Sequence, residues 1–389
     1  MTKITGGKAC IEVLKGAGVE AVFGLLGGSM LELYDALRDE SSMRYIGARD
    51  ERAAGHMADT YARVSGRPGI VLGAQAGPGV ANLVTAVAEA HLAYSPLVAI
   101  AGAITRKDLG KDTFQEFDQL SLFHPIAKRS IMVPTPERLP EMLHEAMHLA
   151  MSGRRGPVVL HAPRDLFSAE IDPPMISPVT CAAPGAPTAE QLARITALLE
   201  GAERPIIFAG GGFKSAEGSR ALAALAETLG VPVVTSTGHL DVLPSDHRWL
   251  AGQTGPRGNA CAVAMSRQCD LILALGTRLA FNSTFLNHDY VNKDAKIVHV
   301  DTEASAVGRY FPAALGIQAG AVETARMISS VVEKTAELRH RWKSWVAQFD
   351  ESKSALTQER SQEESDDAVP MKPHRVLGEI RKSLPRDAI

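Results

Sequence analysis

The stretch GIVLGAQAGPGVAN, residues 69–82, decides the fold of this chain. Ile70–Leu72 is a run of apolar and β-branched residues, which predicts a short buried strand. Gly77–Gly79 predicts a tight turn, because glycine and proline interrupt regular structure. A helix is predicted over 80–93, and the next strand over Leu97–Ala101. A strand, a turn, a helix and a second strand form the unit from which parallel sheets are built.

The same alternation continues on both sides of this stretch, over residues 1–165. Short apolar segments that predict strands alternate there with longer segments that predict helices. The further strands are expected at Ala21–Gly24, Tyr45–Ile46 and Pro157–Leu160, and the further helices at 6–17, from Ser29, and over Glu51–Val64. Continuous apolar strands are typical of a doubly wound parallel sheet that helices cover on both faces.

A second α/β unit is expected after a proline-containing linker at residues 166–185. This central unit, residues 186–338, has predicted strands at Pro205–Ala209, Pro232–Val234, Leu271–Leu275 and Lys296–Val300, and predicted helices at 215–229 and 322–337. Residues 339–370 predict a helix that passes into an exposed connector, and 371–389 the opening helix of a third domain. The predicted fold class is therefore α/β, with two doubly wound parallel-sheet domains, the second Rossmann-like.

The composition argues against several kinds of partner. A net charge of −3 and a pI near 6.5 favour neither nucleic acid nor an anionic membrane surface. The most apolar region, 83–104, contains Glu89 and His91 and therefore does not predict a membrane span. The four cysteines show no C-x-x-C spacing, which indicates reduced thiols and a cytoplasmic location. Histidines such as His56 and His161 show no ligand spacing, so no metal site is predicted.

Five segments have an order and spacing that resemble the pyrimidine-binding domain of thiamine-diphosphate enzymes, acetolactate synthase in particular. They are VFGLLGGS at 22–29, YDAL at 34–37, DERAAGHMAD at 50–59, GPG with Asn82 at 77–82, and TFQE at 113–116. The resemblance covers nearly the whole chain and implies the two-domain α/β fold predicted above. Leu26 is a departure, because the family usually has a proline there.

Glu51 stands directly after a predicted strand, at the start of a predicted helix. A carboxylate at that place is common for a structural reason, since it interacts favourably with the helix dipole. The resemblance implies a chemical role: a hydrogen bond to N1′ of the aminopyrimidine ring and the proton exchange that activates the thiazolium. Burial of a carboxyl group suits this role, because desolvation favours its protonated form.

The same resemblance assigns the other residues around the cofactor. Gly27, Gly28, Pro78 and Asn82 are expected to bind it, because glycine-rich turns leave a surface that a flat heterocycle can approach. By themselves such turns are ordinary strand-to-helix corners. Gln115 is expected to contact the cofactor as well.

Phe114, Gln115 and Lys128 would otherwise be a core aromatic, a surface amide and a surface lysine. In acetolactate synthase an F-Q-E segment is followed, at this same gap, by a lysine. The resemblance therefore implies that Phe114 shapes the substrate pocket and that Gln115 and Lys128 lie near the second 2-oxo acid. A cation there would stabilise a carboxylate or a developing alkoxide.

Three positions of the central unit match segments that hold FAD in acetolactate synthases. Gly211 lies in a glycine turn, Arg278 follows Gly276-Thr277, and Asp301 ends a predicted strand. The chain departs from the family in having Ala280-Phe281-Asn282 after Leu279, and Arg257 where a histidine is usual. FAD, ADP and no nucleotide all remain open for this unit.

The resemblance implies a carboligase that decarboxylates pyruvate and joins the two-carbon unit to a second 2-oxo acid, giving products of the 2-acetolactate type. The Gly-Asp-Gly…Asn segment that holds Mg²⁺ and the diphosphate of thiamine diphosphate is not found in the sequence. We therefore expect no turnover by this polypeptide alone, a homodimer or tetramer, and a separate chain that carries the diphosphate-binding domain. The alternatives are another thiamine-diphosphate decarboxylase or acetyltransferase, similar to sulfoacetaldehyde acetyltransferase, and a non-catalytic scaffold.

Overall fold

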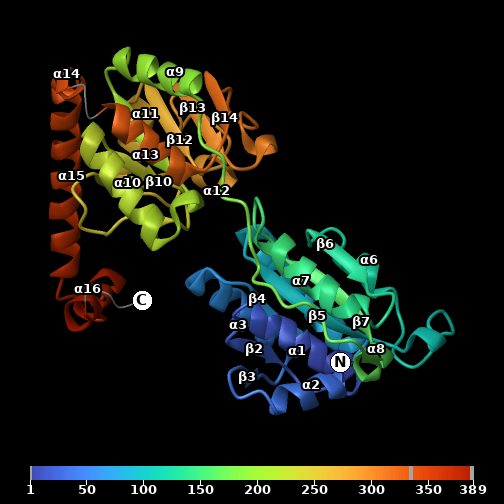
Figure 1. Cartoon of the computed structure of the whole chain (residues 1–389). Helices are drawn as coiled ribbons and strands as arrows, with labels where there is room; N and C mark the ends of the chain where they lie inside the picture. Colours follow the sequence, from blue (N-terminus) through green and yellow to red (C-terminus); the bar gives the residue numbers. More distant parts are fainter. Residues whose placement is uncertain (1, 333–335, 386–389) are drawn as a thin grey trace. The chain divides into compact units, whose positions relative to one another are not determined.

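The computed structural model describes residues 2–332 and 336–385. The chain divides into two compact units, Met1–Ala183 and Pro184–Ile389, each built around its own sheet (Figure 1). The two units are described separately below.

The first unit contains six parallel strands in the order β3-β2-β4-β5-β7-β6. They are β2 (Ala21–Gly24), β3 (Arg44–Gly47), β4 (Gly69–Gly73), β5 (Leu97–Ala103), β6 (Arg129–Met132) and β7 (Val158–Pro163). Every residue of the inner strands β2, β4, β5 and β7 is buried, which explains why these strands are continuous apolar runs in the sequence.

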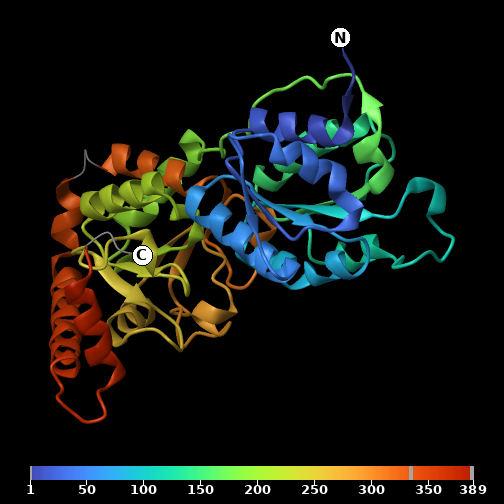
Figure 2. The same cartoon turned by 90° about the horizontal axis from the view of Figure 1, so that it is seen from below.

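Helices cover both faces of this sheet, as Figure 2 shows. The apolar side chains of α1 (Gly6–Gly16), α2 (Leu31–Arg38), α7 (Arg138–Met151) and α8 (Arg164–Ser168) pack on one face. Those of α3 (Glu51–Ser65), α4 (Pro78–Asn82), α5 (Val84–Ala93) and α6 (Gln119–Phe123) pack on the other. Alternate residues of one strand serve the two faces: Val22 joins the first core, and Ala21 and Phe23 join the second.

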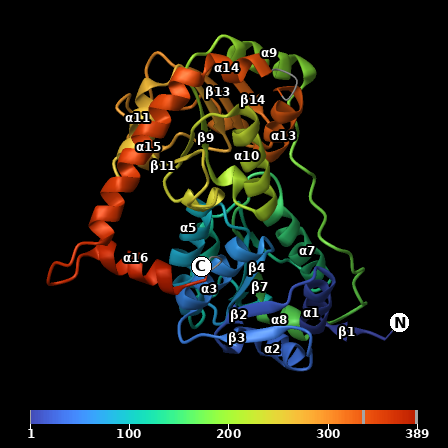
Figure 3. The same ribbon diagram turned by 90° about the vertical axis from the view of Figure 1, so that its left-hand side faces the viewer.

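The second unit repeats this architecture, with parallel strands in the order β11-β10-β9-β12-β13-β14. They are β9 (Pro205–Ala209), β10 (Val233–Thr235), β11 (Leu250–Gln253), β12 (Leu271–Leu275), β13 (Lys296–Asp301) and β14 (Leu315–Gln318). One face carries α9 (Ala189–Glu200), α10 (Ala216–Leu229) and α13 (Ala321–Val332); the other carries α11 (Ala260–Gln268) and the first turns of α15 (Lys343–Glu364), as seen in Figure 3. The predicted α/β class with two doubly wound parallel-sheet domains is confirmed.

Shorter elements complete both units. They are β1 (Ile4–Thr5), β8 (Glu170–Ile171), α12 (Phe281–Thr284), α14 (Ala336–Arg341), α16 (Pro373–Ser383), and the 3₁₀ turns η1 (Gly28–Met30), η2 (Arg106–Asp108), η3 (Gly211–Phe213), η4 (Leu240–Val242) and η5 (Ala304–Ala306). Within residues 2–332 and 336–385, no helix combines the length and the apolar composition needed to cross a membrane.

Two of the predicted boundaries are wrong in part. The linker expected from 166 includes the end of α8 and β8, because Phe167 is buried and β8 pairs with β1 through Ile4 and Ile171. The connector expected from 339 begins inside the central unit. Trp342 and Trp345 are buried there, and their indole N–H groups donate to the carbonyl oxygens of Ala202 and Pro205 at 2.9 and 3.0 Å.

Several helices also differ from the sequence-based expectations. The helix expected over 80–93 is divided into α4 and α5 at Leu83, and the helix expected from Ser29 begins with the 3₁₀ turn η1. Residues 333–335 of the helix expected over 322–337 lie outside the described residues, and 336–337 belong to α14. Residues 371–385 contain α16, and their assignment to a third domain stays a prediction.

A buried histidine of β7, His161, connects this strand with α6 and β6. His161 is fully buried; its Nδ1 lies 2.8 Å from Gln119 Nε2, and its Nε2 lies 2.9 Å from Ser130 Oγ. Because Ser130 Oγ donates to Leu120 O and Gln119 Nε2 can only donate, the neutral ring carries its proton on Nε2. Burial lowers the pKa of His161 to about 4, so the ring stays neutral at ordinary pH.

Acidification is therefore expected to destabilise the first unit through His161. An unfolded histidine titrates near pH 6.5, whereas the folded one titrates near 4, so the unfolded state binds more protons between these values. The contribution is fully present above pH 6.5 and falls by about 3 kcal/mol as the pH drops to 4. Urea unfolding followed at several pH values would measure this slope. It should be weaker in His161→Gln and unchanged in His374→Gln, whose histidine is exposed on α16; equal slopes in all three proteins would contradict the assignment.

Candidate active site

Two of the three predicted catalytic residues, Glu51 and Gln115, lie where the strand order of the first sheet reverses. The chain runs from β2 outward to β3 and then returns to β4 on the other side of β2. In parallel α/β sheets, ligands bind outside the carboxyl ends of the strands at such a reversal. Gly27 and Gly28 follow β2, Glu51 follows β3, Gly77–Gly79 follows β4, and Gln115 follows β5.

Glu51 is buried at this edge, with 4% of its surface exposed. It is the first residue of α3, and the side chain of the preceding Asp50 caps that helix by accepting from Arg52 N at 2.7 Å. Glu51 Oε2 accepts a hydrogen bond from Asn82 Nδ2 at 3.0 Å. Within the part of the chain that the structure describes, no donor reaches Oε1.

Gly79 explains how Oε1 can lie so close to the turn. A Cβ atom built on Gly79 would lie 2.7 Å from Glu51 Oε1, a contact that real side chains do not make. Glycine at this position therefore leaves the carboxylate oxygen uncovered. The structure brings together Glu51, Asn82 and the Gly77–Gly79 turn, with Pro78 as the first residue of α4.

The glycines after β2 lie against the loop after β4. A Cβ on Gly27 would lie 2.7 Å from the carbonyl carbon of Ala74, so only glycine permits this approach. Two hydrogen bonds join the loops: Gly28 N donates to Gln75 Oε1 at 2.9 Å, and Ala76 N donates to Ser29 Oγ at 3.0 Å. These bonds fix the edge of the sheet on which the predicted cofactor-binding residues lie.

Gln115 is brought to the same place by its own loop. Its Oε1 accepts from Gln75 Nε2 at 2.7 Å, and its backbone carbonyl lies against Gly77, where an added Cβ would be 2.4 Å from that oxygen. Gln115 has φ +67°, a left-handed conformation that residues other than glycine seldom adopt. Phe114, next to it, is 86% exposed, so its role in a substrate pocket stays a prediction.

Lys128 lies elsewhere. Its Nζ donates to three backbone carbonyl oxygens near the end of α7, those of Leu149, Ser152 and Arg154, at 2.6, 2.7 and 2.9 Å. An ammonium group has three N–H donors, and the carboxyl end of a helix attracts a cation. The structure therefore gives Lys128 a helix-capping place and does not bring it to Glu51 or Gln115.

The cluster also contains two residues, Gln75 and Tyr34, that the sequence does not predict as site residues. Gln75 bonds both Gly28 and Gln115, although nothing in the sequence distinguishes it from a surface amide. Tyr34 donates to Leu25 O at 2.6 Å, and its pKa is raised by burial first, then by Tyr45 and the Glu51 carboxylate. Tyr34 lies in one of the five family-like segments, but only the fold shows that its phenol faces this edge.

This arrangement fits the aminopyrimidine ring of thiamine diphosphate. The ring needs a buried carboxyl group that can hold a proton at N1′ and a surface without side chains for its flat face. Glu51 Oε1 supplies the first, and the backbone of Gly27, Gly77 and Gly79 supplies the second.

The central unit has a similar edge at its own strand reversal, between β9 and β12. Gly212 N donates to Gly276 O at 3.1 Å, so the two glycine turns are in contact. Gly211, Arg278 and Asp301 follow or end the three neighbouring strands β9, β12 and β13. Burial lowers the pKa of His239, whose ring lies over Gly211, and the cations Lys214 and Arg278 lower it further.

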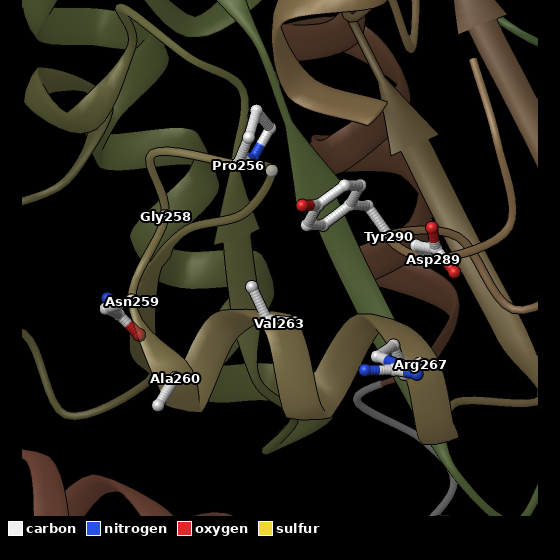
Figure 4. Close-up of a pocket in the computed structure, with 9 residues that line it drawn as sticks. Pro256, Gly258, Asn259, Ala260, Val263, Arg267, Asp289 and Tyr290 are labelled. Atoms are coloured by element: carbon white, nitrogen blue, oxygen red, sulfur yellow. The ribbon is translucent and has the colours of Figure 1, made fainter. Parts of the chain in front are cut away.

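A separate cavity of about 420 Å³ lies in the same unit, beside α11 (Figure 4). It is lined by Gly255, Pro256, Gly258, Asn259, Ala260, Val263, Arg267, Asp289 and Tyr290. None of the predicted nucleotide-binding residues is among them, so this cavity is not the site that the sequence predicts.

One pair of histidines, contrary to the expectation from the sequence, has a spacing that could place both rings on one face of a helix. His144 and His148 are four residues apart on α7, but they bond Ser177 and Thr180 of the following segment, at 3.3 and 2.9 Å. Within residues 2–332 and 336–385, no group of three or more His, Cys, Asp or Glu side chains converges on a metal site.

Comparison with known proteins gives the same division of the chain. Residues 4–122 match the family described as "Thiamine pyrophosphate enzyme, N-terminal TPP binding domain". Residues 192–328 match "Thiamine pyrophosphate enzyme, central domain". The first match contains Glu51, Gly77–Gly79 and Gln115, and the second contains both glycine turns of the central unit.

Several relatives of the chain are named as acetolactate synthases. The chain is 36% identical to the acetolactate synthase large subunit of Corynebacterium glutamicum, over 86% of this chain and 54% of that protein. It is 36% identical to a probable acetolactate synthase large subunit of Methanocaldococcus jannaschii, over 78% and 52%. It is 34% identical to the Haemophilus influenzae large subunit, over 82% and 56%. The chain thus spans about half the length of these relatives. It belongs to the thiamine pyrophosphate enzymes and carries the N-terminal TPP-binding domain and the central domain of that family.

Proposed function

We propose that this chain is the cofactor-activating part of a thiamine-diphosphate-dependent carboligase that acts on 2-oxo acids. The reaction would decarboxylate pyruvate and join the two-carbon unit to a second 2-oxo acid, giving 2-acetolactate or a homologue. The observation that carries the proposal is Glu51, buried at the strand reversal with Asn82 on one oxygen and the side-chain-free Gly79 beside the other. The acetolactate synthase relatives support the choice of carboligation.

Each residue of the cluster has a separate task in this proposal. Glu51 holds and exchanges a proton at Oε1, and Asn82 keeps the carboxylate from turning away by donating to Oε2. Gly27, Gly77 and Gly79 provide the face on which the pyrimidine ring lies. When bound, thiamine diphosphate supplies the carbon nucleophile and the electron sink for decarboxylation. Gln115 offers hydrogen-bond donors to the substrate.

We further propose that the Mg²⁺ ion and the diphosphate are held by residues outside these two domains. The curated relatives support this, since the chain matches only 50–56% of the length of several of them. Those residues would lie in a further polypeptide segment or on a partner chain, within a homodimer or tetramer. The unpaired thiols of Cys10, Cys261 and Cys269, all buried, suit a cytoplasmic location.

An adenine nucleotide, FAD or ADP, is proposed for the central unit. The two glycine turns meet at a strand reversal, which is where phosphates of nucleotides commonly bind. Lys214 and Arg278 add positive charge at the same edge, and Lys214 is 3.5 Å from Asp241. Asp301, at the end of β13, is suited to accept from a ribose hydroxyl group.

Calorimetric titration of the purified chain with thiamine diphosphate and Mg²⁺, thiamine, FAD and ADP tests these assignments. Thiamine and thiamine diphosphate are expected to compete for one site, and one of the two nucleotides to bind independently of them. Addition of ¹³C-labelled pyruvate, followed by NMR, then shows whether CO₂ and 2-acetolactate appear in equal amounts. No binding of either thiamine compound up to about 1 mM, an affinity of about −4 kcal/mol, would overturn the proposed function.

A further inference from the structure

Gln75 connects two loops of the candidate active site through both ends of its side-chain amide. Its Oε1 accepts from Gly28 N at 2.9 Å, and its Nε2 donates to Gln115 Oε1 at 2.7 Å. Gly28 follows β2, Gln75 follows β4 and Gln115 follows β5, so three neighbouring strands contribute one residue each. The chain Gly28–Gln75–Gln115 is called the amide relay below.

The direction of every hydrogen bond in the amide relay is set by chemistry. A backbone N–H can only donate, so the atom of Gln75 that faces Gly28 must be its oxygen. The other end of Gln75 is then an NH₂ group, which also can only donate, and the atom of Gln115 that faces it must be oxygen. The orientation of an amide is often ambiguous, but here a backbone group fixes it over two side chains.

The amide relay fixes which end of the Gln115 amide faces Gln75 and which end is turned away from it. Its oxygen is engaged with Gln75, and its Nε2 carries two N–H groups for which the structure, over residues 2–332 and 336–385, shows no acceptor. A glutamine that is free to rotate can turn either end of its amide to a ligand, whereas the bond to Gln75 holds the oxygen of Gln115 on the side of Gln75 and turns its NH₂ group the other way.

The backbone that carries Gln115 is itself held firmly. The Glu116 carboxylate accepts from Gly110 N at 2.6 Å and from Thr113 N at 3.0 Å, and these bonds lower the pKa of Glu116. Glu116 N donates to Thr113 O at 2.9 Å, which closes the turn. Gly77 accommodates the Gln115 carbonyl at a distance that no Cβ would allow. The donors of Gln115 are therefore presented by a turn with a defined shape.

We infer that Gln75 is a positioning residue that orients the Gln115 amide so that its NH₂ group is presented to a ligand, and that this side of the site therefore selects ligands with an acceptor oxygen, such as the carboxylate or ketone of a 2-oxo acid. The inference rests on the proposed function for the identity of the ligand. The direction of the hydrogen bonds does not depend on the proposed function.

Two substitutions of Gln75 with similar size separate orientation from packing. In Gln75→Glu the carboxylate can still accept from Gly28 N but offers no donor to Gln115. The amide of Gln115 then turns over, and its oxygen faces the ligand. In Gln75→Met both hydrogen bonds disappear and Gln115 is free to rotate. Pyruvate binding to the thiamine-diphosphate-loaded chain, measured by NMR titration, should weaken about 10- to 100-fold in Gln75→Glu and less in Gln75→Met.

A pH series provides a second signature. A protonated glutamic acid again offers a donor to Gln115, so the defect of Gln75→Glu relative to the wild type should shrink as the pH falls. The defect of Gln75→Met should not change with pH relative to the wild type. A role of Gln75 in packing alone predicts a larger defect for methionine, or equal defects at every pH, and either result would overturn the inference.

The hydrogen-bond directions can be tested without any ligand. In chain labelled with ¹⁵N-glutamine, the side-chain NH₂ of Gln75 should exchange slowly with solvent and that of Gln115 quickly. The opposite ranking would contradict the amide relay. If the ranking is as expected but thiamine diphosphate does not bind, the proposed function fails and the positioning role of Gln75 toward Gln115 stands.

Discussion

Replacing Glu51 with glutamine is expected to slow exchange of the thiazolium C2 proton in bound thiamine diphosphate by about 100-fold or more, the usual contribution of a positioned acid or base. Glutamine keeps the size of the side chain, and its oxygen can still accept the hydrogen bond that Asn82 Nδ2 donates to Glu51 Oε2 at 3.0 Å in the wild type. It cannot take up and return a proton. Because only 4% of the surface of Glu51 is exposed, water is a poor substitute.

Proton exchange of bound cofactor in D₂O, sampled by rapid quench and NMR, measures this effect directly and does not require complete turnover. The matched control is Glu89→Gln, which makes the same chemical change on α5. Glu89 lies away from the cluster and forms an ion pair with Arg63, with 3.1 Å between their side-chain atoms. The control should exchange at the wild-type rate. A wild-type rate in Glu51→Gln, with the cofactor bound, would show that Glu51 is not the proton partner.

Gly77→Ala is expected to destabilise the first unit by about 2–4 kcal/mol and to abolish the placement of Gln115. Gly77 has φ +77°, where an alanine is strained, and the new Cβ would lie 2.4 Å from Gln115 O. Unlike the end of a flexible side chain, this backbone oxygen cannot move without moving its turn. The strain and the contact therefore act together.

The positions of the tryptophans allow the destabilisation of the first unit by Gly77→Ala to be distinguished from changes in the second unit. The chain has three tryptophans, Trp249, Trp342 and Trp345, and all belong to the second unit. Both units contribute to the far-ultraviolet circular dichroism, so the urea midpoint measured by dichroism should fall when the first unit unfolds earlier. The midpoint measured by tryptophan fluorescence, which reports the second unit, should stay the same. Gly185→Ala, with no atom within 4 Å of the new Cβ, is the matched control. An unchanged dichroism midpoint in Gly77→Ala would contradict the predicted clash.

Much of the fold was determined by local sequence patterns. The strands at Ala21–Gly24, Pro205–Ala209 and Leu271–Leu275 have the predicted bounds, because each is a short apolar run enclosed by turn residues. The start of α3 at Glu51 was also predicted, since a polar cap precedes an amphipathic segment. The edge strands β6, β11 and β14 were not predicted as strands, because their apolar pattern is weaker and only pairing with a neighbour makes them strands.

The candidate site divides in the same way. A resemblance in motif order predicts Glu51, the glycine turns and Gln115 as site residues, and the structure brings them to one edge of the first sheet. The sequence could not decide that Lys128 caps α7, since the three carbonyl groups it binds are 21–26 residues away in the chain. Nor could it reveal Gln75, whose partners lie 47 and 40 residues away. A side-chain hydrogen bond depends on distances of a few tenths of an ångström between loops, and only the packed sheet brings those loops together.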